Sequence, residues 1–600
     1  MLALLYTLFG IGFLLFIHEG GHFLAARYAG VRVDVFSLGF GPRLWGFRRG
    51  DTDYRICAIP LGGYVKMAGE EGGSLGSDSL LGKSPAWRLL IYSGGILMNF
   101  AFALIVIPIL FRIGVPLQSP VLGNVEPGEA GWEAGLQEGD RILSIDGRSI
   151  HSFSDLASTV ALAELDQALE ISLLRYSETV PRIISVTPGY NQQRGFPTLG
   201  VSPAFQFSVL DETGSEALGV LTEISGRTLT NPLVSRVVTQ EMALRNQPMK
   251  VVYEKQGKAT AEVLRPFHPD SPLQLKLGLY PMHNQVSVVR GPLGDFLKPG
   301  DRLLSMNGHS IRDRNELLYW IALAPHSRSL QIQRDGQSKA LQIPQLSPQV
   351  WANNLVLNSP EGAPFVAVVP DSSAALAGIQ TGDQLLWLGS FKDSPLPFLG
   401  GRVEHFDDVR QRVNSYRLSL ENEEIQAGEP LRCLVLRHGV STEITLTPSW
   451  QELTAARLGI EIRTEIVREA NIASALSTGL SQAKSMVRDA FLSIKQIVSG
   501  NIAAKNLGGI ITIGRATHSF ASNGIVPLLF FLCLISIHLA VLNLLPIPAL
   551  DGGHILFVLY ELLFRKPLSE KIQMGFQVVG FFAIVGLMIF VTFLDIQRLF

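Results

Sequence analysis

Charged residues and cysteines are scarce in this sequence. Asp, Glu, Lys and Arg make up only 17% of its 600 residues, and the mean hydropathy is +0.26. A typical soluble protein has about 25% charged residues, so this composition excludes a disordered chain and disfavours an all-soluble enzyme. The formal net charge of −2 gives no electrostatic basis for nucleic-acid binding. Cys57, Cys433 and Cys533 lie far apart, and neither a disulfide framework nor a thiolate metal site is expected.

The apolar excess gathers at the two ends of the chain. A membrane-spanning helix needs about 20 predominantly apolar residues, and we interpret four apolar runs as transmembrane helices. These runs are Leu2–Ile17, Leu89–Ile113, Ile525–Leu545 and Phe576–Leu594. No positive charge precedes the first run, and His18 and Glu19 interrupt it, which argues against a cleaved signal peptide. The expected fold class is a multi-pass α-helical membrane protein with a large inserted array of β-rich units.

Lys and Arg residues indicate how these helices are oriented. They concentrate in the loop of residues 27–88 between the first two runs, and again in residues 565–575 between the last two. Because short loops rich in Lys and Arg stay in the cytoplasm, both loops are predicted to be cytoplasmic. Both termini and the segment 115–520 then face the outer side, which is the periplasm in a bacterium with two membranes.

The long insert contains a repeat. The stretches GLQEGDRILSIDGRSI (135–150), FLKPGDRLLSMNGHSI (296–311) and GIQTGDQLLWL (378–388) share a Gly-Asp turn, and GVLTEISGRTL (219–229) is a weaker echo without it. They resemble PDZ domains of the circularly permuted bacterial type. We predict four units at 115–204, 205–282, 283–360 and 361–464. PDZ domains bind an extended peptide as an added strand, whereas degenerate units could serve only as spacers.

The strongest chemical signal is HisGluGlyGlyHis at 18–22. Residues four apart lie on one face of a helix, so His18 and His22 can meet one metal ion, with Glu19 beside them as a general base. Ionisable residues inside an apolar span are costly and point to function. A buried histidine bonded to a backbone carbonyl would explain one His but not the set. The Gly20–Gly21 pair is poor for a helix interior and could permit close approach of a neighbouring segment or of substrate.

Two histidines leave a tetrahedral zinc ion short of one protein ligand beside its open position. Asp551 follows the third apolar run in the stretch NLLPIPALDGGH (543–554), whose prolines and glycines break the helix and bend the backbone toward a cavity. An Asp that caps a short helix is the competing interpretation. Asp551 could do both, and the motif at the other end of the chain favours the ligand role.

Together these features resemble the site-2 protease family of intramembrane metalloproteases. The resemblance extends to the stretches FSLGFGP (36–42), IPLGGYVKM (59–67) and NLGGI (506–510), and it covers both membrane ends nearly completely. The insert departs from it, because two PDZ domains are usual where this sequence predicts four. The resemblance implies one Zn2+ per chain, bound by His18, His22 and Asp551, with Glu19 as the general base.

Substrate contacts are implied by the same resemblance. Asn543 is similar in position to a family asparagine that contacts the substrate backbone, although helix–helix hydrogen bonding would also explain an amide there. The segments 54–58 and 64–67, joined by 60–63, are typical of a membrane-associated hairpin within residues 31–68. This hairpin resembles the family's β-loop, whose edge would extend the substrate by strand addition. Its predicted contacts are Gly62, Gly63 and Tyr64.

The resulting organisation has three parts. Residues 1–114 and 524–600 form two membrane halves, residues 115–464 form the array, and residues 465–523 form linker helices that lie at the outer membrane surface or pack on the last unit. The predicted function is intramembrane zinc proteolysis of single-span proteins in the bacterial inner membrane, such as pre-cleaved anti-sigma factors or remnant signal peptides, with the array filtering access. The alternative is a membrane scaffold without proteolytic activity that binds periplasmic peptides through its PDZ units.

Overall fold

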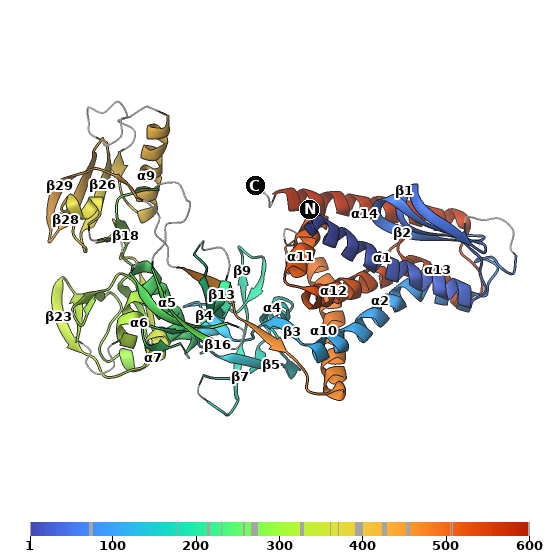
Figure 1. The fold of residues 1–600 in the computed structure, drawn as a ribbon, viewed down its shortest axis with the longest axis horizontal. Helices are drawn as coiled ribbons and strands as arrows, with labels where there is room; N and C mark the ends of the chain where they lie inside the picture. Colours follow the sequence, from blue (N-terminus) through green and yellow to red (C-terminus); the bar gives the residue numbers. More distant parts are fainter. Residues whose placement is uncertain are drawn as a thin grey trace.

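The structure is a computed structural model of the chain. It describes residues 2–70, 76–176, 178–212, 217–229, 231–245, 247–255, 258–265, 274–323, 329–360, 362–369, 371–390, 400–422, 429–451, 457–503, 506 and 508–597. Figure 1 shows two parts: helices from the two ends of the chain lie together on one side, and the β-rich insert lies on the other. Helix α10 (Ile472–Val498) lies between them.

The helical part is built from both ends of the chain. Its helices are α1 (Leu2–Tyr28), α2 (Pro85–Ile113), α11 (Ile510–Ser522), α12 (Ile525–Leu544), α13 (Asp551–Phe564) and α14 (Glu570–Gln597). Within the described chain, Pro85–Ile113, Ile525–Leu544 and Lys571–Gln597 are long and apolar enough to cross a membrane. They correspond to the second, third and fourth expected spans. The first expected span lies in α1, where the side chains of residues 1–9 and 11 fall outside the described part, so a total of four spans stays a prediction.

Residues 33–67 form a small sheet rather than a simple hairpin. The sheet consists of β1 (Val33–Arg49) and β2 (Thr52–Met67). Segment 35–38 of β1 pairs on one side with 63–66, in antiparallel register. On its other side it pairs with 53–56, and here the residue numbers of the two segments rise together. The expected hairpin between 54–58 and 64–67 is therefore wrong. These two segments do not pair with each other in the described register, because each pairs with β1 instead. Among the described pairings, residues 63–67 have a strand partner on one side only, which leaves them at an edge of the sheet.

The insert holds four β-rich units, which we name by their elements. Unit 1 comprises β4 (Leu122–Val125), α3 (Ala130–Glu133), β5 (Arg141–Ile145), β6 (Arg148–Ser149), α4 (Phe153–Ala161), β7 (Leu169–Leu174), β8 (Arg182–Val186), β9 (Gly189–Asn191), β10 (Phe196–Thr198) and β11 (Val201–Pro203). Unit 2 comprises β12 (Phe205–Leu210), β13 (Ala217–Ile224), β14 (Arg227–Thr228), α5 (Pro232–Arg245), β15 (Met249–Lys255), β16 (Lys258–Leu264) and β31 (Leu458–Ile462).

The other two units are built from the chain between β16 and β31. Unit 3 comprises β19 (Gln285–Val289), the short 3-10 helix η1 (Gly291–Leu293), β20 (Arg302–Met306), β21 (His309–Ser310), α6 (Arg314–Leu323), β22 (Ser329–Arg334), β23 (Gln337–Gln342), α7 (Pro348–Asn354) and β24 (Leu355–Asn358). Unit 4 comprises β17 (Gln274–Lys276), β18 (Leu279–Pro281), β25 (Val366–Val368), α8 (Ser373–Leu376), β26 (Gln384–Ser390), β27 (Gly401–Arg402), α9 (Phe406–Glu421), β28 (Leu431–Arg437), β29 (Val440–Leu446) and β30 (Ser449–Gln451).

The strand pairing nests these units instead of placing them one after another. β18 pairs with β25, so unit 3 is inserted within unit 4, and β12 pairs with β31, so both are inserted within unit 2. The sequence predicts consecutive units with boundaries at residues 282 and 360, and the observed strand pairing differs from this order. The repeated sequence identifies the turn of a unit but does not identify the strand that completes its sheet. The whole array is entered through β3 (Val115–Gln118) and left through β32 (Thr464–Val467), which pair with each other.

The Gly-Asp turn that defines the repeat has the same construction in units 1, 3 and 4. Its glycine, at 139, 300 or 382, has φ between +91° and +99°, where a side chain would be strained. The Asp that follows is buried and accepts the backbone N–H of the residue three positions earlier. Each of these Asp residues also pairs with an Arg, in Arg175–Asp140, Arg334–Asp301 and Arg437–Asp383. The sequence of unit 2 has no such turn, and its apolar residues join those of unit 3 in one continuous core instead.

Units 2 and 3 also meet through their longest helices. On α5, Glu241 accepts a 3.1 Å hydrogen bond from Arg312, which lies two residues before the start of α6. Burial raises the pKa of Glu241 to about 7, and Arg312 opposes this shift. In unit 1 the corresponding helix α4 lies instead along a groove, which it lines with Phe153 and Leu156 opposite Pro197 of β10. In unit 2, Pro232 and Ser235 of α5 line a second groove together with Phe207 of β12.

Helix α10 packs on the helical part with its small residues. Ala475, Gly479 and Ala483 are buried there. Gly479 lies so close to α2 that a β-carbon on it would be 2.6 Å from the Pro108 Cα. Apolar residues of α2, α10 and α12 form one core at this place.

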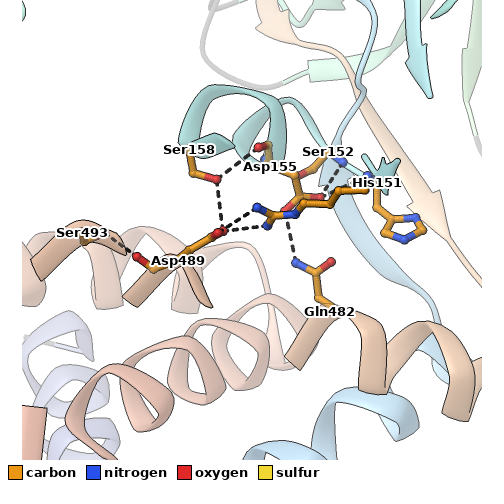
Figure 2. Close-up of polar contacts among 8 residues, drawn as sticks. His151, Ser152, Asp155, Ser158, Gln482, Asp489 and Ser493 are labelled. Atoms are coloured by element: carbon orange, nitrogen blue, oxygen red, sulfur yellow. Dashed lines mark hydrogen bonds and ion pairs between the residues drawn. The ribbon is translucent and has the colours of Figure 1, made fainter. Parts of the chain in front are cut away.

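The same helix holds unit 1. Figure 2 shows Asp155 and Ser158 of α4 facing Gln482 and Asp489 of α10. Arg148 donates two 2.7 Å hydrogen bonds to the Asp489 carboxylate, and Gln482 Nε2 donates to Asp155 Oδ1 at 3.1 Å. The linker helix is therefore a strut, and it supports the first unit rather than the last.

Breaking the Arg148–Asp489 pair should loosen unit 1 from α10. The two side chains are only 9% and 16% exposed, and loss of one partner from a buried pair costs about 3–5 kcal/mol, because the other charge stays buried. We expect Asp489→Ala to increase amide hydrogen exchange in α4 and α10, measured by mass spectrometry on the whole protein. Glu178→Ala is the matched control, because Arg182–Glu178 is an equally bidentate but exposed pair of unit 1. Exchange in Asp489→Ala equal to that of the control would rule out the strut.

Candidate metal centre

Two histidines of α1 share one helix face. His18 and His22 are 7% and 8% exposed, and their Nε2 atoms lie 3.4 Å apart. Gly21, between them, lies against Gly94 of α2, and a β-carbon on either glycine would overlap the backbone of the other. A β-carbon on Gly20 would meet no atom within 4 Å. Of the two glycines in the motif, Gly21 is thus the one that lets α2 approach.

Helix α2 supports both imidazole rings. His22 Nδ1–H donates to the Ile91 carbonyl oxygen at 2.8 Å, which leaves a lone pair on Nε2. His18 Nδ1 lies 3.1 Å from Asn99 Nδ2, and Asn99 Oδ1 is buried without a hydrogen-bond partner in the described chain. Turning this amide over would let Oδ1 accept from Nδ1–H and would free the Nε2 lone pair of His18 as well. Gly95 makes room for the rings, because a β-carbon there would lie 2.5 Å from both His18 Cε1 and His22 Nε2.

The third predicted ligand arrives from the other end of the chain. After α12 the proline-rich loop turns back, so that Asp551 becomes the first residue of α13. Gly552 allows this turn, because a β-carbon there would overlap the Leu545 carbonyl group. Leu550 occupies the N-cap position and no side-chain cap is formed, so Asp551 does not cap the helix.

The three predicted ligands converge on one point. Asp551 Oδ2 lies 3.2 Å from His18 Nε2 and 3.4 Å from His22 Nε2, and it is buried with no hydrogen-bond partner among the described residues. Two imidazole lone pairs and a carboxylate oxygen would repel one another at this separation unless a cation lay among them. A tetrahedral zinc ion with bonds of about 2.0–2.1 Å holds its ligand atoms about 3.3 Å apart, which the three distances fit. Within the described chain, these residues are the one group of this kind that could hold a metal ion.

Glu19 lies beside the edge of the β1–β2 sheet. A β-carbon on Gly63 would be 3.0 Å from Glu19 Cγ and 2.9 Å from the Ser37 carbonyl oxygen. Because these contacts are tighter than a side chain tolerates, glycine at 63 is what lets the strand edge approach the predicted general base. The sheet edge formed by residues 63–67 and the side chain of Glu19 are therefore neighbours.

The other predicted substrate contacts lie in two places. Asn543 Nδ2, near the end of α12, is 3.2 Å from His18 Nε2 and thus lies at the metal centre. Tyr64 stacks on Phe40 of β1, with 6.0 Å between ring centroids and 8° between planes, and Gly62 lies against the same ring. The structure therefore brings Asn543 to the predicted ligands, whereas Gly62 and Tyr64 both contact Phe40 on the sheet.

Sequence reasoning missed the contribution of α2. Ile91, Gly95 and Asn99 are four residues apart and share one helix face, but a backbone carbonyl and a glycine carry no chemical signature. Asn99 did carry a chemical signature, because burying an amide in an apolar 29-residue helix is costly unless the amide is hydrogen-bonded. A search for polar residues at helical spacing in the apolar runs would have found it.

Substitution of Gly95 should remove the metal ion. A methyl group there would overlap both imidazole rings, so we expect Gly95→Ala to bind zinc at least about tenfold more weakly than wild type, measured by competition with a chelator. Helix propensity cannot cause this loss, since Ala is a better helix former than Gly by about 1 kcal/mol. Gly20→Ala, in open space one residue from Glu19, is the control and should bind zinc normally. Wild-type zinc affinity in Gly95→Ala would contradict the geometry of the centre.

Known proteins resemble this chain over nearly its whole length. The family model "Peptidase family M50" matches residues 6–587. The chain is 26% identical to the regulator of sigma-E protease RseP of Salmonella typhimurium, with 100% of both chains covered. It is 25% identical to a Chlamydia trachomatis protein named as a candidate zinc metalloprotease, with 98% of both covered.

A solved structure of a PDZ domain protein from Parabacteroides distasonis also aligns with 57% of this chain and 95% of its own. The identity is 11% and the TM-score is 0.13, which is too low to bear on the fold. The family match over most of the chain confirms the resemblance to site-2 proteases: the chain belongs to peptidase family M50.

Proposed function

We propose that this chain is a zinc metalloprotease that cuts the transmembrane segments of single-span proteins within the bilayer. The observation that carries the proposal is the convergence of His18, His22 and Asp551 among apolar helices, with Glu19 next to His18 in α1. The names of the RseP and metalloprotease relatives, which align over nearly their full length, support it. One Zn2+ per chain is proposed because the described residues offer one ligand group.

The chemistry divides among few side chains. A zinc ion held by His18, His22 and Asp551 would supply Lewis acidity toward water and toward a peptide carbonyl. Glu19 would take the proton from the attacking water and pass it to the leaving amine. Asn543, whose amide lies at the same place, would hold the substrate backbone or stabilise the developing oxyanion.

A helical substrate has to unwind before its backbone can reach this site, because the carbonyl groups of a helix are bonded internally. The edge of residues 63–67 offers a replacement partner, and Gly63 brings this edge against Glu19. An unwound segment that added to the edge would satisfy its own backbone groups at a depth that bulk water does not reach. The same strand would then lie beside the general base.

The substrate class follows from this location. In the inner membrane of a bacterium, single-span proteins such as anti-sigma factors already cut on the outer side, or remnant signal peptides, fit such a site. The Lys and Arg residues of 27–88 and 565–575 favour an array on the periplasmic side. The array would screen substrates by size or by a new carboxyl terminus, with the groove between α4 and β10 of unit 1 as the binding place.

Substitution of Glu19 should separate catalysis from metal binding. Gln has nearly the same shape as Glu but cannot accept the proton, so we expect Glu19→Gln to keep its zinc and to cleave at least about a hundredfold more slowly. The assay is cleavage of a tagged single-span substrate in liposomes, with zinc measured on the same preparation. Cleavage by Glu19→Gln at the wild-type rate would exclude the general-base role.

Two histidine variants complete this experiment. His22→Ala lacks a ligand and should lose zinc and cleavage together. His538→Ala is its matched control, because His538 lies in α12 but donates its Nδ1–H to the Leu534 carbonyl of its own helix at 2.9 Å. Zinc retained in His22→Ala would contradict the ligand assignment, and absence of zinc from the wild-type protein would favour the non-proteolytic scaffold.

Removal of the array should relax selection by length. β3 and β32 pair at its base, so a deletion of residues 122–462 can keep this pair and α10 in place. We expect this variant to cleave substrates whose outer domains make them resistant to the wild-type protein, because nothing then blocks their approach. Substrates with short outer segments are the control and should be cut by both. Unchanged selectivity in the deletion variant would refute filtering.

A further inference from the structure

Four residues of α2 form one stripe that continues past the metal centre. Arg88, Tyr92, Gly95 and Asn99 are spaced by four, three and four residues, the spacing of a single helix face. Gly95 and Asn99 lie against the two histidine rings. Arg88 and Tyr92 contact α13 instead, the helix that begins with Asp551.

The partners on α13 are His554 and Glu561. The rings of Tyr92 and His554 are stacked, with 4.8 Å between centroids and 15° between planes. Arg88 donates a 2.6 Å hydrogen bond to Glu561, in an ion pair whose side chains are 13% and 19% exposed. Lower numbers on α2 meet higher numbers on α13, so the two helices run antiparallel along one seam.

This seam sets where Asp551 lies. His554 follows Asp551 by about one helical turn, so the stack with Tyr92 joins α13 to α2 close to the predicted ligand. The loop before Asp551 includes Ala549 at φ +73°, a conformation that costs a non-glycine residue about 1–2 kcal/mol. A strained loop of this kind keeps its shape only where the surrounding structure holds it.

One side of the seam faces a partly open cavity. The cavity has a volume of about 280 Å3, and Arg88, Tyr92, His554 and Glu561 all line it. The ring stack and the ion pair therefore join α13 to α2 at the border of this cavity.

We propose that Tyr92 and His554 are positioning residues of the metal centre, with Arg88–Glu561 as a second anchor of the same seam. They hold α13 in the register that brings Asp551 Oδ2 to the two Nε2 atoms. This inference rests on the proposed function, in which Asp551 is a zinc ligand. Because the contact is a stack of two rings, another aromatic residue at position 92 or 554 should also hold α13 in place.

The test is zinc affinity, measured on purified whole protein in detergent by competition with a chelator. We expect Tyr92→Leu and His554→Leu each to weaken zinc binding about 10- to 100-fold, the effect typical of residues that orient metal ligands. Tyr92→Phe and His554→Phe keep a ring pair and should bind zinc within about twofold of wild type. The double leucine variant should be no weaker than either single variant, because all three remove the same contact.

Phe520→Leu is the matched control. Phe520 and Phe531 stack with similar geometry, at 4.6 Å and 11°, in a contact between α11 and α12 that includes no metal ligand. Loss of that stack should lower the unfolding temperature and leave zinc affinity unchanged. If the leucine variants at 92 and 554 fail to fold, Glu561→Gln tests the second anchor and should also weaken zinc binding.

Two results would overturn the positioning role. One is wild-type zinc affinity in the folded leucine variants or, where these do not fold, in Glu561→Gln. The other is equal weakening in the leucine and phenylalanine variants. Failure of the proposed function looks different, because wild-type protein would then hold no zinc, or His22→Ala would hold it as tightly as wild type.

Discussion

A metal centre among apolar helices has to satisfy every polar atom that it brings there, because a bilayer supplies no water to do so. In this chain α2 meets most of that requirement without providing a ligand. The Ile91 carbonyl takes the His22 N–H, Asn99 lies on His18, and Gly95 leaves space for both rings. Asp551 Oδ2 has no partner of this kind in the described chain, and a zinc ion between it and the histidines would supply one.

The same helix ties this centre to the β-rich insert. α2 is followed directly by β3, α10 packs across its Pro108, and unit 1 rests on α10 through Arg148 and Asp489. The nested order of units 2, 3 and 4 adds to this rigidity, because the chain passes between units through paired strands. An array built in this way favours one fixed body over a set of loosely tethered domains.

The predicted ligands could be found in the sequence because their chemistry is local. Two histidines four residues apart and an Asp among prolines and glycines are legible patterns, and the structure brings all three side chains together. Their role as ligands stays a prediction. The order of strands in residues 33–67 and the nesting of the units could not be found, because both depend on pairing between segments that are distant in sequence. The contact between α2 and α13 could not be predicted for the same reason. Tyr92 and His554 form no recognisable motif in the sequence, and only the packing of the two helices brings their rings together.

X-ray absorption at the zinc edge, on wild-type protein purified with zinc, tests the ligand set most directly. Ligation by His18, His22 and Asp551 predicts a first shell of nitrogen and oxygen at about 2.0–2.1 Å. It also predicts outer-shell scattering from two imidazole rings. Sulfur at about 2.3 Å, or scattering from any other number of imidazoles, would contradict a centre built from these three residues.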